Sequence, residues 1–294
     1  MKVRPKLLLF LVTMLLLSCV KNQEIINRND DIHPGHFIND WKYEFVLNDP
    51  DKNIYRLWIP PGVTPKAIVA LSAGGGADGT GLVEDQKWRD FATRENLALL
   101  GTHVLSGAEQ ASTNLLTALK RIGDARGVSY IANLPILLRG HSFGGGFSYE
   151  FASLHPKKTL AFCNIKGGNL ELKPSNLPPG LLLVGEKDTA SRYENNKAVF
   201  LAQRAKGDIF CFAVAPGSGH GVDDSDDLVR SFFAAIVKKR LVNSVIQDVD
   251  ITTIPLGNIT TLEAFDYASF PSNKDEASCL INDDFKTTWL NFVK

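Results

Sequence analysis

Several features are scarce or missing in this chain of 294 residues, and each absence excludes a class of protein. Cysteine is rare: there are four, at Cys19, Cys163, Cys211 and Cys279, and no two form a Cys-x-x-Cys pair. The sequence therefore indicates neither a zinc or redox site nor a disulfide framework. Cys163 and Cys211 lie inside the apolar runs LAFCNI and IFCFAV, which is typical of buried thiols that pack as small apolar groups.

Neither sign of charge is in excess, because 32 Lys and Arg residues balance 32 Asp and Glu residues. A protein that binds nucleic acid carries a basic excess or a basic stripe, since it must neutralise phosphates. We therefore expect no nucleic-acid partner. The length allows one large domain or two small ones, and the composition is that of an ordinary globular protein.

No uncharged apolar run is long enough to cross a bilayer. The N-terminal run LLLFLVTMLLLSCV has 14 residues, and a membrane-spanning helix needs about 20. Lys2, Arg4 and Lys6 precede it, which is the layout of a secretory signal. The end of the run, LLSC, resembles a bacterial lipobox. We therefore expect residues 1–18 to be a lipoprotein signal peptide. Cys19 would carry the lipid and anchor an exported protein in the bacterial cell envelope, on its periplasmic or surface face.

The rest of the chain divides into a tether, an alternating region and an extension. Residues 19–40 are polar, show little periodicity and are interpreted as a tether. In residues 41–241 a predicted hairpin (41–47 and 55–60) is followed by strand-like apolar runs that alternate with segments of helical periodicity. The predicted strands are 67–72, 98–104, 134–140, 159–165, 180–186 and 208–216; the predicted helices are 85–96, 109–127, 147–156, 192–207 and 227–241.

This alternation predicts an α/β fold with a mostly parallel sheet covered by helices on both faces. Residues 242–294 break the pattern: VDITTI and NITTLEAF have a short β-like character, and the final NDDFKTTWLNFVK predicts a helix. A segment of this size would form only a thin core by itself. We interpret it as an extension packed on the main domain, with a separate small domain as the alternative. Parallel sheets carry functional residues on the loops that follow their strands.

The strand 134–140 runs directly into the sequence GHSFG, and a predicted helix follows. This is the context of a nucleophile elbow, in which a serine occupies a tight turn between a strand and a helix. Gly140 and Gly144 suit this turn because side chains there would collide with the neighbouring backbone. Ser142 is therefore the candidate nucleophile. The backbone N–H of Phe143, at the start of the helix, is a candidate oxyanion donor.

A serine nucleophile needs a base, and the base needs a carboxylate to orient it. The strand 208–216 is followed by GSGHG, which places His220 in a loop of small residues. Asp188 comes directly after the strand 180–186 and is the favoured acid. The alternatives are three carboxylates at the strand end or close after the histidine: Glu186, Asp223 and Asp224.

The loop after the strand 67–72 begins AGGG, and its glycines let the backbone approach a substrate closely. We expect Gly74 or Gly75 to provide the second oxyanion donor. Gly74, Gly76 and Gly79 also match the G-x-G-x-x-G pattern of a dinucleotide-binding loop. Helical periodicity begins only near residue 85, so no helix N-terminus is expected at these glycines to hold a pyrophosphate. The pattern favours an oxyanion loop, and we expect neither an organic cofactor nor a metal.

Two other histidines lie near these loops. His141, inside the elbow, is more typical of a packed structural residue than of a catalytic one. His103 ends the predicted strand 98–104, where it would either line the rim of the site or be buried.

Residues 41–241 resemble an α/β-hydrolase of the compact esterase kind, similar to dienelactone hydrolases, feruloyl esterases and polyhydroxybutyrate depolymerases. The AGGG loop, GHSFGG, and the pair GEKD and GSGHG carry the resemblance. The nucleophile, acid and base also follow in the chain order of that fold. The resemblance implies the α/β-hydrolase fold and a catalytic triad of Ser142, Asp188 and His220.

Two details narrow the resemblance. Ala73 stands where the hormone-sensitive-lipase group has the histidine of an HGGG motif, so that group is not favoured. Only 14 residues separate the strands 159–165 and 180–186, where the family often inserts a lid. The short connection predicts no large lid and an open cleft.

These features favour a lipid-anchored serine hydrolase that opens a carboxylic ester, small or at a polymer end, through an acyl-enzyme. One alternative is a secreted serine peptidase of the same fold, which would need a cleft that fixes a peptide chain. Another is a surface binding lipoprotein without activity. The presence of all three catalytic residue types and both oxyanion loops argues against this second alternative.

Overall fold

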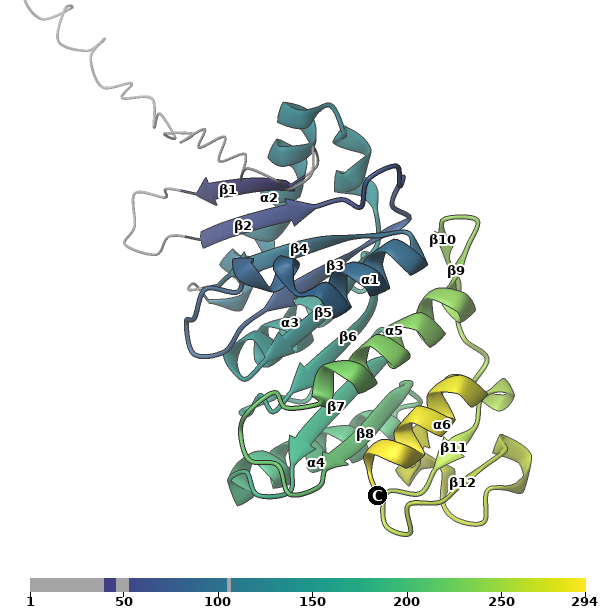
Figure 1. The fold of residues 1–294 in the computed structure, drawn as a ribbon. Helices are drawn as coiled ribbons and strands as arrows, with labels where there is room; N and C mark the ends of the chain where they lie inside the picture. The colour runs from purple at the N-terminus through teal and green to yellow at the C-terminus, as the bar shows by residue number, and fades with distance from the viewer. Residues whose placement is uncertain (1–39, 46–52, 105–106) are drawn as a thin grey trace, which may run out of the picture.

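A computed structural model describes residues 40–45, 53–104 and 107–294 of the chain (Figure 1). The predicted signal peptide, Cys19 and the tether up to residue 39 lie outside these residues. The fold is built on an eight-stranded sheet with the order β1-β2-β4-β3-β5-β6-β7-β8. Its strands are β1 (Asp40–Phe45), β2 (Asn53–Trp58), β3 (Ala67–Ser72), β4 (Leu97–His103), β5 (Ile136–His141), β6 (Thr159–Ile165), β7 (Gly180–Gly185) and β8 (Phe210–Ala215).

Six neighbouring strands, from β4 to β8 in the sheet order, run parallel to one another. The hairpin of β1 and β2 is added antiparallel at the β4 edge. The prediction of a mostly parallel sheet is therefore confirmed. The connection 166–179 between β6 and β7 contains neither helix nor strand, in agreement with the predicted absence of a large lid.

Helices cover both faces of the sheet, as predicted. One face is covered by α2 (Ala108–Arg126), α3 (Phe143–Leu154) and α4 (Ala190–Arg204), and the other by α1 (Gln86–Glu95), α5 (Ser225–Arg240) and α6 (Asp283–Phe292). In the described part of the chain, none of the helices combines the length and the apolar character needed to cross a membrane.

The pattern of the central strands follows from this double cover. Successive side chains of a strand point to opposite faces, so a strand buried on both sides must be apolar throughout. In β3, Ala67, Val69 and Leu71 join the core beneath α1 and α5, while Ile68 and Ala70 join the core beneath α2 and α3. Cys163, Cys211 and Cys279 are also buried, and all three are free thiols.

The structure differs from the sequence-based prediction in two places. The helix predicted at 147–156 begins four residues earlier, at Phe143, because the elbow leads directly into α3 despite its three glycines. The segment VDITTI is not a strand but contains the 3-10 helix η3 (Ile251–Thr253). Only the end of NITTLEAF forms a strand, β12 (Ala264–Phe265), which is two residues long.

The segment 242–294 packs against β8, the edge strand of the main sheet (Figure 1). Ser278 Oγ lies 2.9 Å from Phe212 N and 3.0 Å from Phe212 O, and Trp289 Nε1 donates to the same carbonyl at 3.0 Å. α6 lies on α5, with the rings of Phe285 and Phe232 5.3 Å apart. Side chains of the extension thus satisfy backbone groups of β8 that an open sheet edge would leave to solvent.

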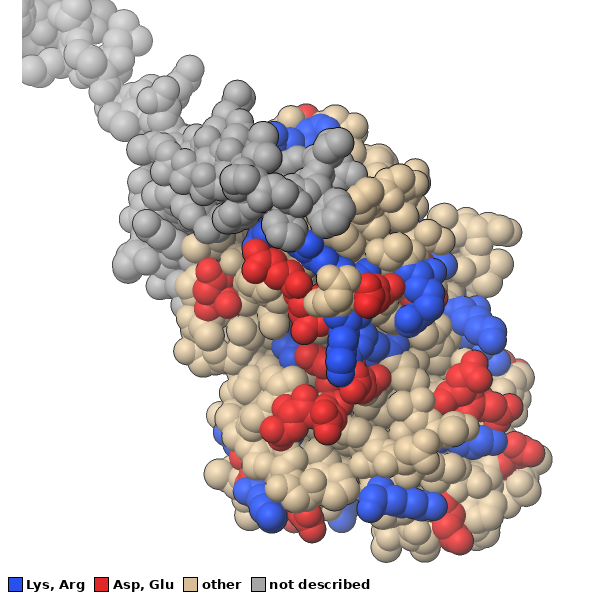
Figure 2. Space-filling model, viewed as in Figure 1, with Lys and Arg blue, Asp and Glu red and all other residues tan. Residues whose placement is uncertain are grey.

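Charges of both signs are interspersed on the face that carries α1 and α5 (Figure 2). Lys87 on α1 pairs with Asp227 on α5 at 3.4 Å, and Asp227 also pairs with Arg230. The Lys87–Asp227 pair is exposed on both sides and contributes little to stability. Among the described residues of this face, the two signs alternate and form no continuous basic patch.

Replacement of Trp289 tests how strongly the extension holds to the sheet. The side chain is 1% exposed and bonded to the β8 backbone, so Trp289→Ala leaves both a cavity and an unpaired carbonyl. We expect it to lower the free energy of unfolding by about 3–5 kcal/mol, measured by urea denaturation. The exposed Thr287→Ala on the same helix is the control and should change it by less than about 0.5 kcal/mol. Equal effects of the two variants would contradict the packing described.

Candidate active site

Ser142 occupies a sharp turn between β5 and α3. Its backbone has φ 53° and ψ −116°, a conformation that costs free energy for any residue except glycine. Its N–H donates to Ile165 O of the neighbouring strand at 2.8 Å, which ties the turn to the sheet. The turn reverses the chain within one residue and projects the serine hydroxyl out of the sheet.

The glycines around Ser142 leave room for this turn. A Cβ on Gly140 would stand 1.8 Å from Gly144 O, and one on Gly144 would stand 2.6 Å from Ala73 O. A Cβ on Gly145 would stand 2.1 Å from Asn164 Oδ1. No side chain fits at these distances, so the elbow requires glycine at all three positions. Gly140 and Gly144 are the two that the sequence pattern predicts.

His220 and Asp188 complete a chain of hydrogen bonds to Ser142. The Ser142 hydroxyl donates to His220 Nε2 over 2.9 Å. Because a carboxylate only accepts, His220 Nδ1 carries the proton that it donates to Asp188 Oδ2, also over 2.9 Å. Ser142 follows β5, Asp188 follows β7 and His220 follows β8, so three loops at one end of the sheet meet here.

The Asp188 carboxylate is held in its ionised form. Burial alone would raise the pKa of Asp188, but hydrogen bonds from His220 and from the Thr189 N–H, with the charge of Arg192, together keep it below its usual value. Thr189 N lies 2.7 Å from Asp188 Oδ1, and Arg192 Nη1 donates to the same oxygen. An ionised carboxylate at this position can stabilise a protonated imidazole at His220.

The alternative acids have other partners. Glu186 Oε2 accepts the Gly217 N–H at 2.6 Å, and Asp223 contacts Ser218 Oγ and Lys166 Nζ. Asp224 is the residue before α5. The hydrogen bond of His220 Nδ1 therefore singles out Asp188 among the four carboxylates.

Lys166 fixes the loop that carries His220, a role that the sequence pattern did not indicate. Its side chain is 0% exposed, and its ammonium contacts Ser218 Oγ, Gly221 O and Asp223 Oδ2, the last at 3.2 Å. All three acceptors belong to the loop on either side of His220. Asp223 accepts from both Ser218 and Lys166, and these hydrogen bonds lower the pKa of its carboxyl group. A buried lysine therefore holds the loop that carries His220 in place.

A second buried cation, Arg139, links the elbow to α5. It lies in β5 directly before Gly140, and its guanidinium forms a bidentate pair with Asp226 at 2.7 and 3.0 Å. It also donates to Ser72 O, the end of β3, at 3.1 Å. The loop with His220 ends at α5, so this pair fixes the distance between the nucleophile and the end of that loop.

His141 also positions His220, in keeping with the structural role expected for it. Its Nε2 donates to the backbone carbonyl of His220 at 2.6 Å, and the two rings lie 5.1 Å apart. Burial lowers the pKa of His141, and the charges of Arg139, His220 and Lys166 lower it further. His141 Nε2 therefore holds the loop that carries His220 and takes no part in a proton transfer.

The loop after β3 brings Gly74 next to the nucleophile. A Cβ on Gly74 would lie 2.9 Å from Ser142 Cβ, whereas one on Gly75 would have nothing within 4 Å. Gly75 and Gly76 both have positive φ, 60° and 74°, inside a turn closed by Ala77 N and Gly74 O at 2.9 Å. His103 Nε2 donates to Gly76 O at 2.8 Å and so braces this turn. Of the two glycines predicted, Gly74 is the one beside the serine.

Phe143, the other predicted oxyanion donor, is the first residue of α3. The N–H groups in the first turn of a helix have no acceptor within the helix, so the Phe143 N–H is available to a ligand of the elbow.

The glycine loop after β3 does not lead into the α-helix that a dinucleotide-binding loop requires. The five-residue 3-10 helix η1 (Thr80–Glu84) follows Gly79, and the first α-helix starts only at Gln86.

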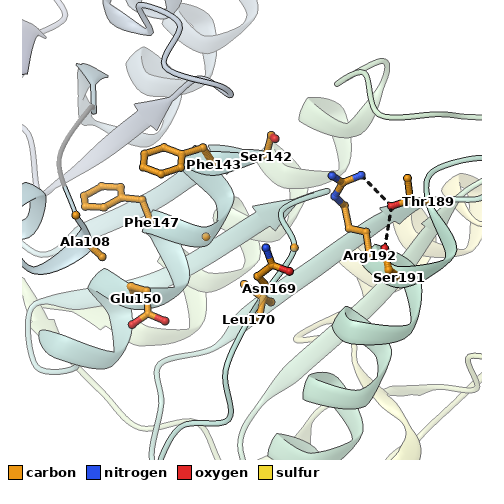
Figure 3. A pocket seen from close by; sticks show the side chains of 13 residues that line it. Ala108, Ser142, Phe143, Phe147, Glu150, Asn169, Leu170, Thr189, Ser191 and Arg192 are labelled. Atoms are coloured by element: carbon orange, nitrogen blue, oxygen red, sulfur yellow. Dashed lines mark hydrogen bonds between the residues drawn. The ribbon is translucent and has the colours of Figure 1, made fainter.

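A cavity of about 470 Å³ opens beside Ser142 (Figure 3). One part of its wall is apolar, with Phe143, Phe147 and Leu170, and another is polar, with Thr189 and Arg192. The remaining lining residues are Gly107, Ala108, Gly146, Glu150, Gly168, Asn169 and Ser191. Across the described residues, no three His, Cys, Asp or Glu side chains come close enough together to hold a metal ion.

Comparison with known proteins supports the fold. No family model and no curated protein matches the sequence. Among solved structures, a carboxylesterase named EstE1 from a metagenomic library is similar with a TM-score of 0.53 and 15% identity, over 69% of this chain and 90% of that one. An esterase from Pyrobaculum calidifontis has a TM-score of 0.52 and 14% identity, over 67% and 85% of the two chains.

A third similar structure is FphF of Staphylococcus aureus, described as a fluorophosphonate-binding serine hydrolase. Its TM-score is 0.51 at 13% identity, over 68% of this chain and 99% of that one. The chain has the α/β-hydrolase fold, as the sheet order, the turn at Ser142 and these three likenesses show together. The identities are too low for the likeness to say more than the fold.

Two neighbouring glycines of α3 provide a matched test of the elbow. Gly144→Ala places a methyl group 2.6 Å from Ala73 O, so we expect it to destabilise the protein by about 1–3 kcal/mol and to abolish the reaction of Ser142 with a fluorophosphonate probe. A Cβ on Gly146 would meet nothing within 4 Å, so Gly146→Ala should raise stability by up to about 1 kcal/mol. Gly146 lines the cavity, but one methyl group there should leave Ser142 open to a small fluorophosphonate. Thermal melting and gel fluorescence measure both outcomes, and normal labelling of Gly144→Ala would contradict the geometry.

Replacement of Lys166 tests the clamp on the histidine loop. Lys166→Met keeps the volume but removes the side-chain donor to Gly221 O and one of the two donors to Asp223, which we expect to cost about 1–3 kcal/mol. The displaced His220 should lower kcat about 100-fold with a much smaller change in KM, measured with a chromogenic ester. Lys166→Arg, which keeps the charge, should recover part of kcat. An unchanged kcat in Lys166→Met would show that the loop holds its place without the clamp.

Proposed function

We propose that this protein is a serine hydrolase that cleaves carboxylic esters through an acyl-enzyme. The observation that supports this most directly is the hydrogen-bonded series from Ser142 to His220 to Asp188 at the mouth of the cavity. Each of the three groups follows its own strand, and the nucleophile stands on a strained turn. Backbone strain of this kind clusters at functional sites.

In the proposed mechanism, Ser142 Oγ attacks the ester carbonyl while His220 Nε2 takes the hydroxyl proton. Asp188 holds the Nδ1–H tautomer and stabilises the imidazolium. The N–H groups of Phe143 and Gly74 stabilise the negative charge on the carbonyl oxygen. His220 then gives its proton to the departing alcohol. A water molecule, deprotonated by His220, attacks the acyl-enzyme and releases the carboxylic acid.

The size of the cavity suits a small ester or the end of an ester polymer, since about 470 Å³ lies within the range of small-molecule sites. The short connection 166–179 leaves the cleft without a cap from that part of the chain. No cofactor takes part in the steps proposed, which use only the side chains and N–H groups named.

Substitution of the triad tests the proposed function. Ser142→Ala should lower kcat/KM for short-chain nitrophenyl esters more than about 1,000-fold and abolish fluorophosphonate labelling. Asp188→Asn should lower kcat more than about 100-fold, because the wrong tautomer of His220 is favoured. Glu186→Gln removes the charge of a nearby carboxylate that accepts the Gly217 N–H and does not contact His220, and should stay within about tenfold of wild type.

Three outcomes would contradict the proposal in different ways. Activity retained by Ser142→Ala would remove the nucleophile assigned here. Faster cleavage of amides than of matched esters would assign the machinery to a peptidase. A wild-type protein that neither cleaves esters nor reacts with the probe would indicate a binding protein on a hydrolase scaffold.

We also propose that Cys19 carries lipid and anchors the protein in the bacterial cell envelope. The strand register shows where the chain enters the fold. Asp40 pairs with Trp58, which pairs with Leu99 near the start of β4. Residue 40 therefore lies at the end of the sheet where the parallel strands begin, and Ser142 follows the opposite end of β5.

Detergent partition tests the anchor. We expect the wild-type protein, produced in a bacterium that lipidates its own lipoproteins, to enter the detergent phase of Triton X-114. Cys19→Ser should stay in the aqueous phase, because it lacks the acceptor for the lipid. Ser142→Ala, which changes only the nucleophile, should partition like wild type. A Cys19→Ser protein that still enters the detergent phase would contradict lipidation.

A further inference from the structure

The side chain of Arg192 has a place in the site that the triad does not require. It stands on the first turn of α4 and lines the same cavity as Ser142. Figure 3 shows its guanidinium pointing from α4 into this cavity on the side of Ser142. We propose that Arg192 binds an anionic group of the substrate, so that the enzyme prefers esters that carry a carboxylate or a similar anion. This inference rests on the ester hydrolysis proposed above.

The guanidinium keeps donors free for such a group. It offers five N–H donors in a planar fork. The hydrogen bonds it makes within the described residues come from Nη1, which donates to Asp188 Oδ1 and to Thr189 Oγ1, the latter at 3.3 Å. The edge formed by Nε and Nη2 is the one that binds carboxylates in a bidentate manner, as Arg139 binds Asp226 in this same protein.

The side chain of Arg192 is partly open to solvent, with 25% of it exposed. Gly168, beside Nε, has no side chain to cover it, and even a Cβ added there would stand 3.4 Å from Nε. Thr189, Ser191 and Asn169 lie in the same polar part of the wall and offer further hydrogen bonds. The site thus has room and donors for a planar anion.

The charges that line the cavity favour an anion over a cation. Glu150 is the acidic residue of the wall, and its carboxylate is paired with Lys173 Nζ at 2.8 Å. Asp188, the partner of Arg192, faces His220 with its other oxygen and must stabilise the imidazolium during the reaction. A substrate carboxylate would therefore share Arg192 with Asp188 without displacing it.

The opposite part of the wall defines the rest of the substrate. Phe143, Phe147 and Leu170 form an apolar surface in the same cavity. A cavity with one apolar part and one cationic part is complementary to an amphiphilic ester, with a hydrocarbon or aromatic portion and an anionic portion. Arg192 would act as a specificity residue, while its bond to Asp188 also makes it a positioning residue for the triad.

Pairs of esters that differ only in charge separate these two roles. One pair places the charge on the acyl side, nitrophenyl adipate against nitrophenyl hexanoate. The other places it on the alcohol side, 3-carboxyphenyl butyrate against 3-carbamoylphenyl butyrate. Wild type should prefer the anionic member of at least one pair by about tenfold or more in kcat/KM, mostly through a lower KM. A tenfold preference corresponds to about 1.4 kcal/mol, and a hydrogen bond between charged groups contributes more than this.

Three variants complete the experiment. Arg192→Leu should lose the preference, even if kcat falls for both esters because Asp188 loses a partner. Arg192→Lys keeps the charge without the fork and should keep only part of the preference. Lys197→Leu removes one positive charge from α4 at a residue that does not line the cavity, and should leave the preference unchanged.

The outcomes that overturn this inference differ from those that overturn ester hydrolysis. Equal kcat/KM values for both members of both pairs, or a preference that survives in Arg192→Leu, would show that Arg192 serves Asp188 alone. No hydrolysis of any ester, neutral or anionic, would instead count against the proposed function.

Discussion

The candidate active site depends on one strained residue, Ser142, whose backbone is held at φ 53°. This conformation is unfavourable for serine, so the surrounding structure must make the relaxed alternative still less favourable. It does so with a hydrogen bond from the Ser142 N–H to β6 and with glycines that let β5, α3 and the loop after β3 come into backbone contact. The close packing at Gly144 and Gly74 is thus a consequence of the turn, and it brings the candidate oxyanion donors to the serine.

The loop that carries His220 is held in place by several separate contacts. Lys166, directly after β6, binds its backbone and side chains, His141 binds the His220 carbonyl from the elbow, and the Arg139–Asp226 pair holds the helix at its end. Each contact comes from a residue next to the elbow or the adjacent strand. The 2.9 Å distance between Ser142 Oγ and His220 Nε2 is therefore set by buried ionic and hydrogen-bonded contacts and not by the loop alone.

The elements that the sequence predicted best are those whose pattern is local. Strands such as β3 and β6 are continuous apolar runs, and the rule that functional residues follow parallel strands selected Ser142, Asp188 and His220 from a long list of polar residues. The start of α3 was predicted too late because three glycines lower its helical propensity, and packing of the elbow overrides that penalty. The two-residue strands of the extension are too short to give a periodic signal.

Lys166, Arg139 and Arg192 were not predicted, for a different physical reason. In the sequence each is a single charged residue of the kind that usually faces solvent. Lys166 meets Asp223 across 57 residues and Arg139 meets Asp226 across 87, so only the fold reveals these pairs. Arg192 lies four residues after Asp188, a spacing that would have suggested contact on a helix. The helix was predicted to begin at residue 192, and in the structure it begins at Ala190, so the contact lies at its very start.

The extension covers the edge of β8, and this cover also matters while the chain folds. The backbone of Phe212 is satisfied by Ser278 and Trp289, which lie 66 and 77 residues further along the chain. Until those residues are in place, β8 presents an unpaired edge that can pair with another chain. A partly folded chain in which this flank is still open can therefore pair with other chains and aggregate. The last segment of the sequence acts as a built-in protection against that hazard.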